Sequence, residues 1–66
     1  MAITLKTLVS RNDDLRNIHI PEGAEGTVID IIIEDGGKTV NFLLEFDDGD
    51  GGEIEWFSSS EVEEKF

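Results

Sequence analysis

A run of acidic residues interleaved with glycine is the part of this sequence that most suggests chemistry. The segment Asp47-Asp48-Gly49-Asp50-Gly51-Gly52-Glu53 places four carboxylates within seven residues. Hard cations such as Ca²⁺ bind clustered oxygen ligands on flexible loops. The helix-loop-helix calcium motif does not fit, because Gly52 and Ser59 stand where its ligands belong when positions are counted from Asp48. The segment is therefore predicted to be a hairpin turn, and weak calcium binding stays open.

The remaining candidates for catalysis are sparse. His19 is the single histidine, and the chain has no cysteine, so neither a thiolate nucleophile nor a His/Cys metal site is expected. Paired carboxylates for acid-base work could come from Asp30, Glu45, Glu53 and Glu55, but a solvated strand face explains these residues with fewer assumptions. A chain of 66 residues also has little room for a deep substrate cavity. We expect no enzyme and no cofactor.

Charge excludes further classes of function. Sixteen acidic residues oppose five basic ones, for a formal net charge of −11. Phosphate recognition depends on Lys and Arg, so direct binding of nucleic acid is not expected. Asp30 interrupts the isoleucine-rich stretch, which is far shorter than the roughly 18 apolar residues of a membrane span. The first residues do not have the layout of a secretory signal. These features predict a cytoplasmic protein, monomeric or weakly self-associating, without membrane contact.

Hydrophobic periodicity predicts a single all-β domain over residues 1–66. Alternation of apolar and polar residues, separated by Gly- and Asp-rich turns, is typical of short antiparallel strands. Residues 10–26 form the longest expected loop, and Ile18 and Ile20 within it indicate that this loop folds back on the strands. Ser58, Ser59 and Ser60 predict one helical turn. The expected strands are 4–9, 27–34, 39–46, 53–57 and 61–63.

The apolar strand faces define the expected core. Trp56 is assigned to the interior with Ile54, so its neighbour Phe57 must point to the opposite face. Phe57 or Leu43 is then expected to form an exposed apolar spot. The predicted core comprises Leu5, Val28, Ile31, Ile33, Val40, Phe42, Leu44, Phe46, Ile54, Trp56 and Val62.

Two stretches carry a resemblance to a known fold. They are Gly23-Ala24-Glu25-Gly26-Thr27-Val28-Ile29-Asp30-Ile31 and Phe42-Leu43-Leu44-Glu45-Phe46-Asp47-Asp48, the latter followed by the ending from Trp56 to Val62. The chain resembles the Src-homology-3-like small barrel and is similar to KOW-type modules and to small bacterial barrel families of unknown function. The resemblance implies a five-stranded antiparallel barrel with a long first loop and one short 3-10 turn before the last strand. It also implies that the glycines allow a tight entry into the second strand.

The familiar ligands of such barrels are not expected here. The aromatic strip that signalling Src-homology-3 domains use for proline-rich peptides is missing, since the chain has no Tyr. The basic surface with which ribosomal KOW modules meet RNA is missing too, because only Lys38 and Lys65 oppose the acidic residues after Pro21. The resemblance therefore predicts a fold and leaves the ligand open.

An acidic surface on the central strands is the predicted partner site. Clustered carboxylates repel one another, which raises their pKa values, and a basic partner relieves that repulsion. The expected contact residues are Glu45, Asp47, Asp48, Asp50, Glu53 and Glu55, with Phe57 or Leu43 as apolar anchor. The predicted function is a non-catalytic interaction module or accessory subunit that docks on a larger, locally basic protein. The alternative is a nucleic-acid mimic of bacterial or phage type, and solubility alone would account for the same composition.

Overall fold

The computed structural model describes residues 2–47 and 52–65 and is all-β, as predicted. Every strand pairing is antiparallel, and the helical elements in the described part of the chain are two 3-10 turns, η1 Asp35–Gly37 and η2 Ser59–Glu61. No helix in these ranges is long and apolar enough to span a membrane. The strands are β1 Thr4–Thr7, β2 Arg11–Asp13, β3 Ile18–Ile20, β4 Glu25–Glu34, β5 Thr39–Phe46, β6 Glu53–Ser58 and β7 Val62–Glu64.

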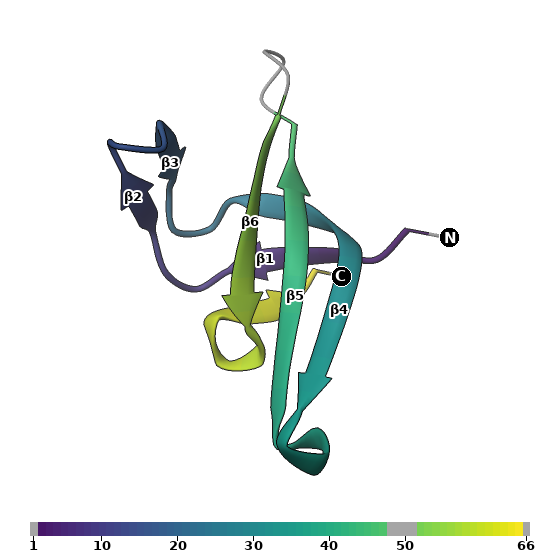
Figure 1. Cartoon of the computed structure of the whole chain (residues 1–66). Coiled ribbons are helices and arrows are strands. Elements are labelled where there is room, and N and C mark those ends of the chain that lie inside the picture. Colours follow the sequence, from purple (N-terminus) through teal and green to yellow (C-terminus); the bar gives the residue numbers. More distant parts are fainter. Residues whose placement is uncertain (1, 48–51, 66) are drawn as a thin grey trace.

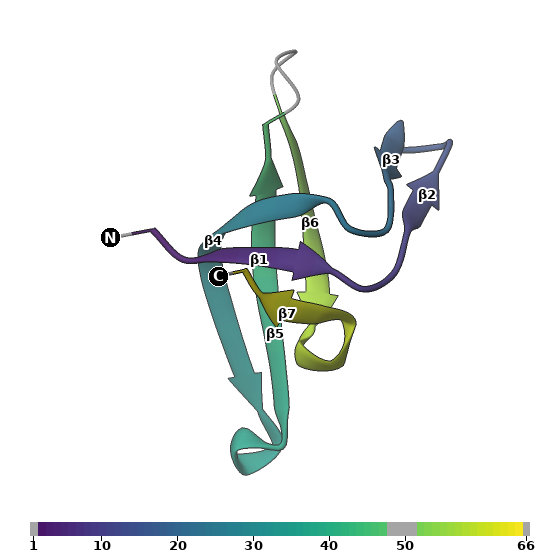
Figure 2. The same cartoon turned by 180° about the vertical axis from the view of Figure 1, so that it is seen from behind.

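Strand β4 joins two groups of strands. The five-stranded sheet has the order β6-β5-β4-β1-β7, and β2 and β3 form a separate ribbon. The start of β4 pairs with β1 as far as Thr27, whereas β4 pairs with β5 from Thr27 to Glu34, with a register shift between Val28 and Asp30. A β-bulge adds one residue to a strand and bends it. Figures 1 and 2 show β4 running beside β1 and then turning to run beside β5.

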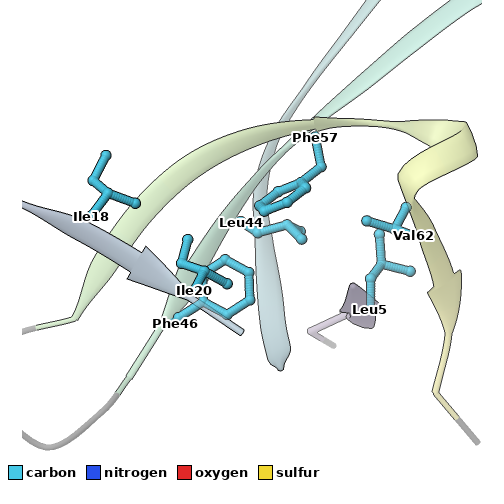
Figure 3. Packing of buried hydrophobic residues seen from close by; sticks show 7 residues of the cluster. All are labelled: Leu5, Ile18, Ile20, Leu44, Phe46, Phe57 and Val62. Carbon is cyan, nitrogen blue, oxygen red and sulfur yellow. The ribbon is translucent and has the colours of Figure 1, made fainter. Parts of the chain in front are cut away.

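The core lies where these two groups of strands face each other. Phe46 and Phe57 meet edge to face, with ring centroids 5.8 Å apart and planes at 70°, a favoured aromatic geometry. The two isoleucines of β3 are buried against this cluster, which confirms that the long loop folds back. Loop and strand residues thus share one interior (Figure 3), made of Leu5, Ile18, Ile20, Leu44, Phe46, Phe57 and Val62.

The β2–β3 ribbon was not predicted. Arg11, Asn12 and Asp13 form a strand although their side chains do not favour one. They pair with Ile20, His19 and Ile18 respectively. Because Ile18 and Ile20 are held in the core, β3 is fixed and offers an edge on which β2 can form.

Glycines allow the tight entry into β4 that the resemblance implied. At Gly26 a Cβ atom would lie 2.8 Å from Phe46 Cε1, which is closer than side chains approach in proteins. Gly23 has a φ of 87°, a conformation that side chains rarely adopt. One glycine therefore leaves room for the core phenylalanine, and the other makes the turn before the strand.

Several predicted core residues lie outside the core. Ile31 and Ile33 are 47% and 65% exposed, because the β4–β5 hairpin extends past β1 and no described element covers it. Ile54 is 49% exposed, and Trp56 is only half-buried. Val28 and Phe42 pack on the core as partly buried residues, and Val40 is half-buried.

The assignment of the two aromatic residues of β6 was the wrong way round. Phe57 pairs with Phe42, whereas Trp56 pairs with Leu43. Residues opposite one another in an antiparallel pair share a face, so Phe57 faces the core and Trp56 faces away from it. Phe57 is 1% exposed. The sequence pattern favoured the wrong face because that face of β6 carries two apolar residues and the core face carries one.

This arrangement predicts unequal effects of substituting the two aromatic residues. Phe57→Leu should lower the free energy of unfolding by about 1–2 kcal/mol, through lost volume and lost aromatic contact. Trp56→Thr, which keeps strand propensity, should change it by less than about 1 kcal/mol. Urea unfolding followed by circular dichroism measures both values. A larger loss from Trp56→Thr than from Phe57→Leu would contradict the observed orientation.

Candidate interaction surface

The face of β4, β5 and β6 that points away from the core, called here the outer face, combines apolar and acidic side chains. Asp30 pairs with Leu43, and Leu43 pairs with Trp56, so these three residues form a row across three strands. In the next row Glu45 pairs with Ile54. Asp30 and Glu45 are exposed, and Leu43 and Trp56 are half-buried. The outer face therefore has an apolar centre with two carboxylates beside Leu43, that of Asp30 on β4 and that of Glu45 further along β5.

Isoleucines extend this apolar centre in two directions. Ile54 lies two residues before Trp56 on β6, and alternation along a strand places both on one face. Ile32 pairs with Asn41, two residues before Leu43, and is 42% exposed. No described element packs over this region. Large apolar side chains exposed next to one another on a small protein mark a candidate contact surface.

Two of the predicted acidic contact residues lie on the core side instead. Glu55 pairs with Leu44 and is 6% exposed, and Glu53 pairs with Phe46. The Glu55 carboxylate accepts hydrogen bonds from Arg16 Nη2 at 2.7 Å and from the Trp56 N–H at 3.0 Å. The outward orientation expected for Glu53 and Glu55 is therefore wrong.

The β2–β3 ribbon explains how these carboxylates are accommodated. Arg16 follows β2 and reaches Glu55, while the N–H of His19 on β3 donates to Glu53 Oε2 at 3.3 Å. A buried carboxylate needs such partners, since desolvation without them is costly. The ribbon therefore covers an acidic part of the sheet's inner face and offsets its charge.

Phe57 is enclosed and does not act as an exposed anchor. The Cζ atom of Arg11 lies 4.5 Å from the centroid of its ring, a favourable cation–π distance. Arg11 Nη1 donates to the Trp56 carbonyl at 3.1 Å, and its Nη2 donates to Glu61 Oε2 at 3.2 Å. Arg11 therefore connects the β2–β3 ribbon to β6 and η2 by hydrogen bonds, and its guanidinium group covers the ring of Phe57.

The other predicted contact residues fall into two groups. Leu43 and Glu45 lie on the outer face, in agreement with the prediction, and Asp47 is exposed just after β5. Asp48 and Asp50 lie outside the described residues, as does most of the turn considered for calcium. Within residues 2–47 and 52–65 no group of three potential metal ligands comes together. His19 forms an exposed pair with Asp14, its Nε2 lying 3.2 Å from Oδ1.

Specific hydrogen bonds lower the pKa values of two carboxyl groups outside the predicted acidic contact residues. The Arg16 side chain holds the pKa of Asp13 below its usual value. The backbone N–H of Ser58, 2.9 Å from Glu61 Oε1, lowers the pKa of Glu61, with further contributions from the Ser58 hydroxyl and Arg11. Local donors therefore outweigh the overall negative charge at these two positions.

Comparison with known proteins adds no assignment. No family model matches the chain, and comparisons with curated proteins and with solved structures find no match either. The candidate surface consequently depends on the geometry of this chain alone.

Sequence reasoning did not place Trp56, Ile54, Asp30 or Ile32 on the candidate surface. The alternation of Phe42, Leu44 and Phe46 along β5 is the sequence signal for the correct face of β6. When Phe46 is paired with Glu53, Phe57 lies on the same face as these three residues. That pairing follows from the length of the turn between the strands. A turn shorter or longer by one residue would have placed Trp56 in the core.

The lowered pKa of Glu61 predicts how its contribution to stability depends on pH. A carboxyl group whose pKa is lower in the folded state stabilises the fold above its ordinary value of 4.5, and this contribution is lost as pH falls through the folded-state pKa. Glu61→Gln should therefore lower the free energy of unfolding at pH 7 by up to about 1 kcal/mol, a typical value for a helix-cap interaction. Near pH 3 the parent and the variant should be almost equally stable.

Urea titrations of both proteins at the two pH values measure this difference. The two proteins share every charged group except Glu61, so the effects of all the other charges on stability are common to both. A difference that stayed constant with pH would contradict the assigned role of Glu61.

Proposed function

We propose that this chain is a non-catalytic interaction module of the Src-homology-3-like small-barrel type that docks on a basic surface of a larger protein. The strand order β6-β5-β4-β1-β7 and the 3-10 turn before β7 support the barrel assignment. In this proposal the protein acts in the cytoplasm, alone or as a weak homo-oligomer. It carries no cofactor and makes no direct contact with nucleic acid or membrane.

The row formed by Asp30, Leu43 and Trp56 is the observation that carries the proposal. Trp is enriched among the residues that dominate binding energy, and such residues lie at the centre of an interface with polar groups around them. Here Trp56 is half-buried against its own sheet, so its side chain is already partly ordered before binding. Leu43 lies opposite it and widens the apolar centre.

The carboxylates beside this centre favour a basic partner. Asp30 and Glu45 flank the apolar residues on a chain with a formal net charge of −11. Complementary charge raises the rate of association and excludes acidic competitors. A nucleic-acid mimic needs carboxylates in rows that replace phosphates. On the outer face carboxylates and apolar side chains alternate instead, which favours a protein-docking module over a mimic.

Two pairs of substitutions on the outer face test this function. A pull-down from an extract of the producing cells identifies retained proteins, and the affinity of a purified candidate partner is then measured at low and physiological salt. Trp56→Thr with Leu43→Thr should weaken binding by about 30-fold or more, as expected for loss of a central anchor. Asp30→Asn with Glu45→Gln should mainly slow association and reduce its salt dependence.

Leu15→Thr is the matched control, since Leu15 is 99% exposed and lies on the β2–β3 connection, away from the outer face. This variant should bind as the parent does. Loss of binding with the charge pair alone would favour the mimic. Full affinity in both outer-face variants would show that this surface is not the docking site.

A further inference from the structure

The second half of β4 has an unpaired edge. Strand β1 pairs with β4 only as far as Thr27, and its last backbone hydrogen bond runs from the Val28 N–H to the Ile3 carbonyl at 2.9 Å. From Asp30 to Glu34, β4 pairs with β5 on one side. No described strand lies along the other side, which forms an outer edge of the arrangement in Figure 2.

The bulge determines which backbone groups point to this open edge. Alternate residues of a paired strand direct their N–H and C=O groups to opposite sides, and one inserted residue reverses the order. The Val28 N–H points toward β1, so beyond the bulge Ile31 and Ile33 direct their backbone groups to the same, now vacant, side. The Asp30 carboxylate accepts a hydrogen bond from the Ile31 N–H at 2.8 Å. At this position the Asp30 carboxylate is the hydrogen-bond acceptor that a carbonyl group of a neighbouring strand would otherwise be.

The side chains along the edge are unusually apolar for an exposed strand. Ile29 and Ile31 are each 47% exposed, and Ile33 is 65% exposed. An open groove beside them is lined by Ala2, Ile3, Val28, Ile29, Asp30 and Ile31. Exposed edges in proteins are usually short, charged or covered, because an open edge is a template for another strand. From Asp30 to Glu34 the charged residues are Asp30 and Glu34, on either side of Ile31, Ile32 and Ile33.

We infer that this edge binds an extended, basic segment of the partner as an added antiparallel strand. Residues opposite each other share a face, so the face of Ile31 and Ile33 calls for apolar side chains on the incoming strand. The other face presents Asp30, Ile32 and Glu34 in alternation and calls for Lys or Arg at each end with an apolar residue between them. The complementary segment is therefore a short run of β-branched residues with a basic residue on either side.

A second copy of this chain is a poor occupant. An antiparallel pairing of two β4 edges centred on Ile32 would place Asp30 of each copy opposite Glu34 of the other. Like charges directly opposite one another destabilise a strand pair. Each copy also has a formal net charge of −11, which opposes association. Charge therefore selects a basic segment over self-pairing.

The inference rests on the proposed function for the basic character of the partner, but it concerns the backbone edge of β4, and Asp30 and Ile32 belong to both surfaces. The outer face centres on Leu43 and Trp56 of β5 and β6, whereas the open edge lies on the side of β4 away from β5. Substitutions in the two places can be measured separately.

The probe is the capped peptide Thr-Lys-Val-Val-Val-Lys-Thr, whose sequence reads the same in both directions. In the antiparallel orientation its first valine should pair with Ile33 and its third with Ile31, with both N–H groups directed at β4. N-methylation of these two valines should weaken binding about tenfold or more, because each removes a backbone hydrogen bond. N-methylation of the central valine, whose N–H points away, should weaken it by less than about threefold. Titration followed by NMR should move the Ile31 and Ile33 amide signals.

Matched protein variants test the same contact from the other side. Ile33→Pro removes an edge donor that faces away from β5, where proline is tolerated in sheets, and should weaken peptide binding about tenfold. Ile33→Thr keeps the donor and loses part of the apolar contact, so it should weaken peptide binding by clearly less than Ile33→Pro does. Asp30→Asn with Glu34→Gln should weaken binding, and a peptide with Glu in place of Lys should not bind. Circular dichroism confirms that each variant is folded.

The outcomes separate this inference from the proposed function. Equal affinity of the two N-methylated peptides, or signal changes confined to Trp56 and its neighbours, would overturn the edge-strand inference and leave the outer-face proposal standing. Edge binding that persists while Trp56→Thr and Leu43→Thr leave partner affinity unchanged would support the inference and remove the proposed surface. Concentration-dependent self-association abolished by Ile33→Pro, without peptide binding, would assign the edge to a second copy and overturn the basic-strand inference.

Discussion

The β-bulge between Val28 and Asp30 is the constraint on which the rest of this structure depends. It allows one strand to belong to both groups of strands, because β4 bends at this point from β1 toward β5. The interior between the groups is then filled by a few large side chains, among which Phe46 and Phe57 meet edge to face. The same bend carries the far part of β4 past the end of β1, and this leaves an edge of isoleucines with none of the described strands beside it.

A second constraint is the charge carried into the sheet by β6. Its core face bears Glu53 and Glu55 as well as Phe57, so the fold needs donors above two carboxylates. The β2–β3 ribbon supplies them through Arg16 and the His19 N–H, and Arg11 covers the Phe57 ring. Arg11 and Arg16 therefore interact with acidic and aromatic side chains of the protein itself. The chain nevertheless carries sixteen acidic residues against five basic ones, and this excess is the electrostatic argument for the proposed basic partner.

The two surfaces considered for binding have a common origin. A chain of 66 residues cannot cover both faces and both edges of a sheet. The outer face around Trp56 and the open edge of β4 are the parts that remain after the core has formed. Each combines apolar side chains with carboxylates at its margins. Charged margins favour the solubility of exposed apolar groups, and in the proposed function they also select partners of opposite charge.

Short-range chemistry in the sequence was sufficient to predict the all-β class, the antiparallel hairpins, the 3-10 turn after β6 and the return of Ile18 and Ile20 to the core. Alternation and turn residues act over a few positions, so they can be read along the chain. The face of Trp56 and Phe57, the burial of Glu55 and the exposure of Ile31 and Ile33 were decided by tertiary structure. Strand register reverses with a one-residue change in a turn, and exposure depends on whether a distant strand is long enough to cover a residue. Both depend on contacts between segments far apart in sequence, so Leu43 and Glu45 could be placed from the sequence whereas Trp56 and the edge of β4 could not.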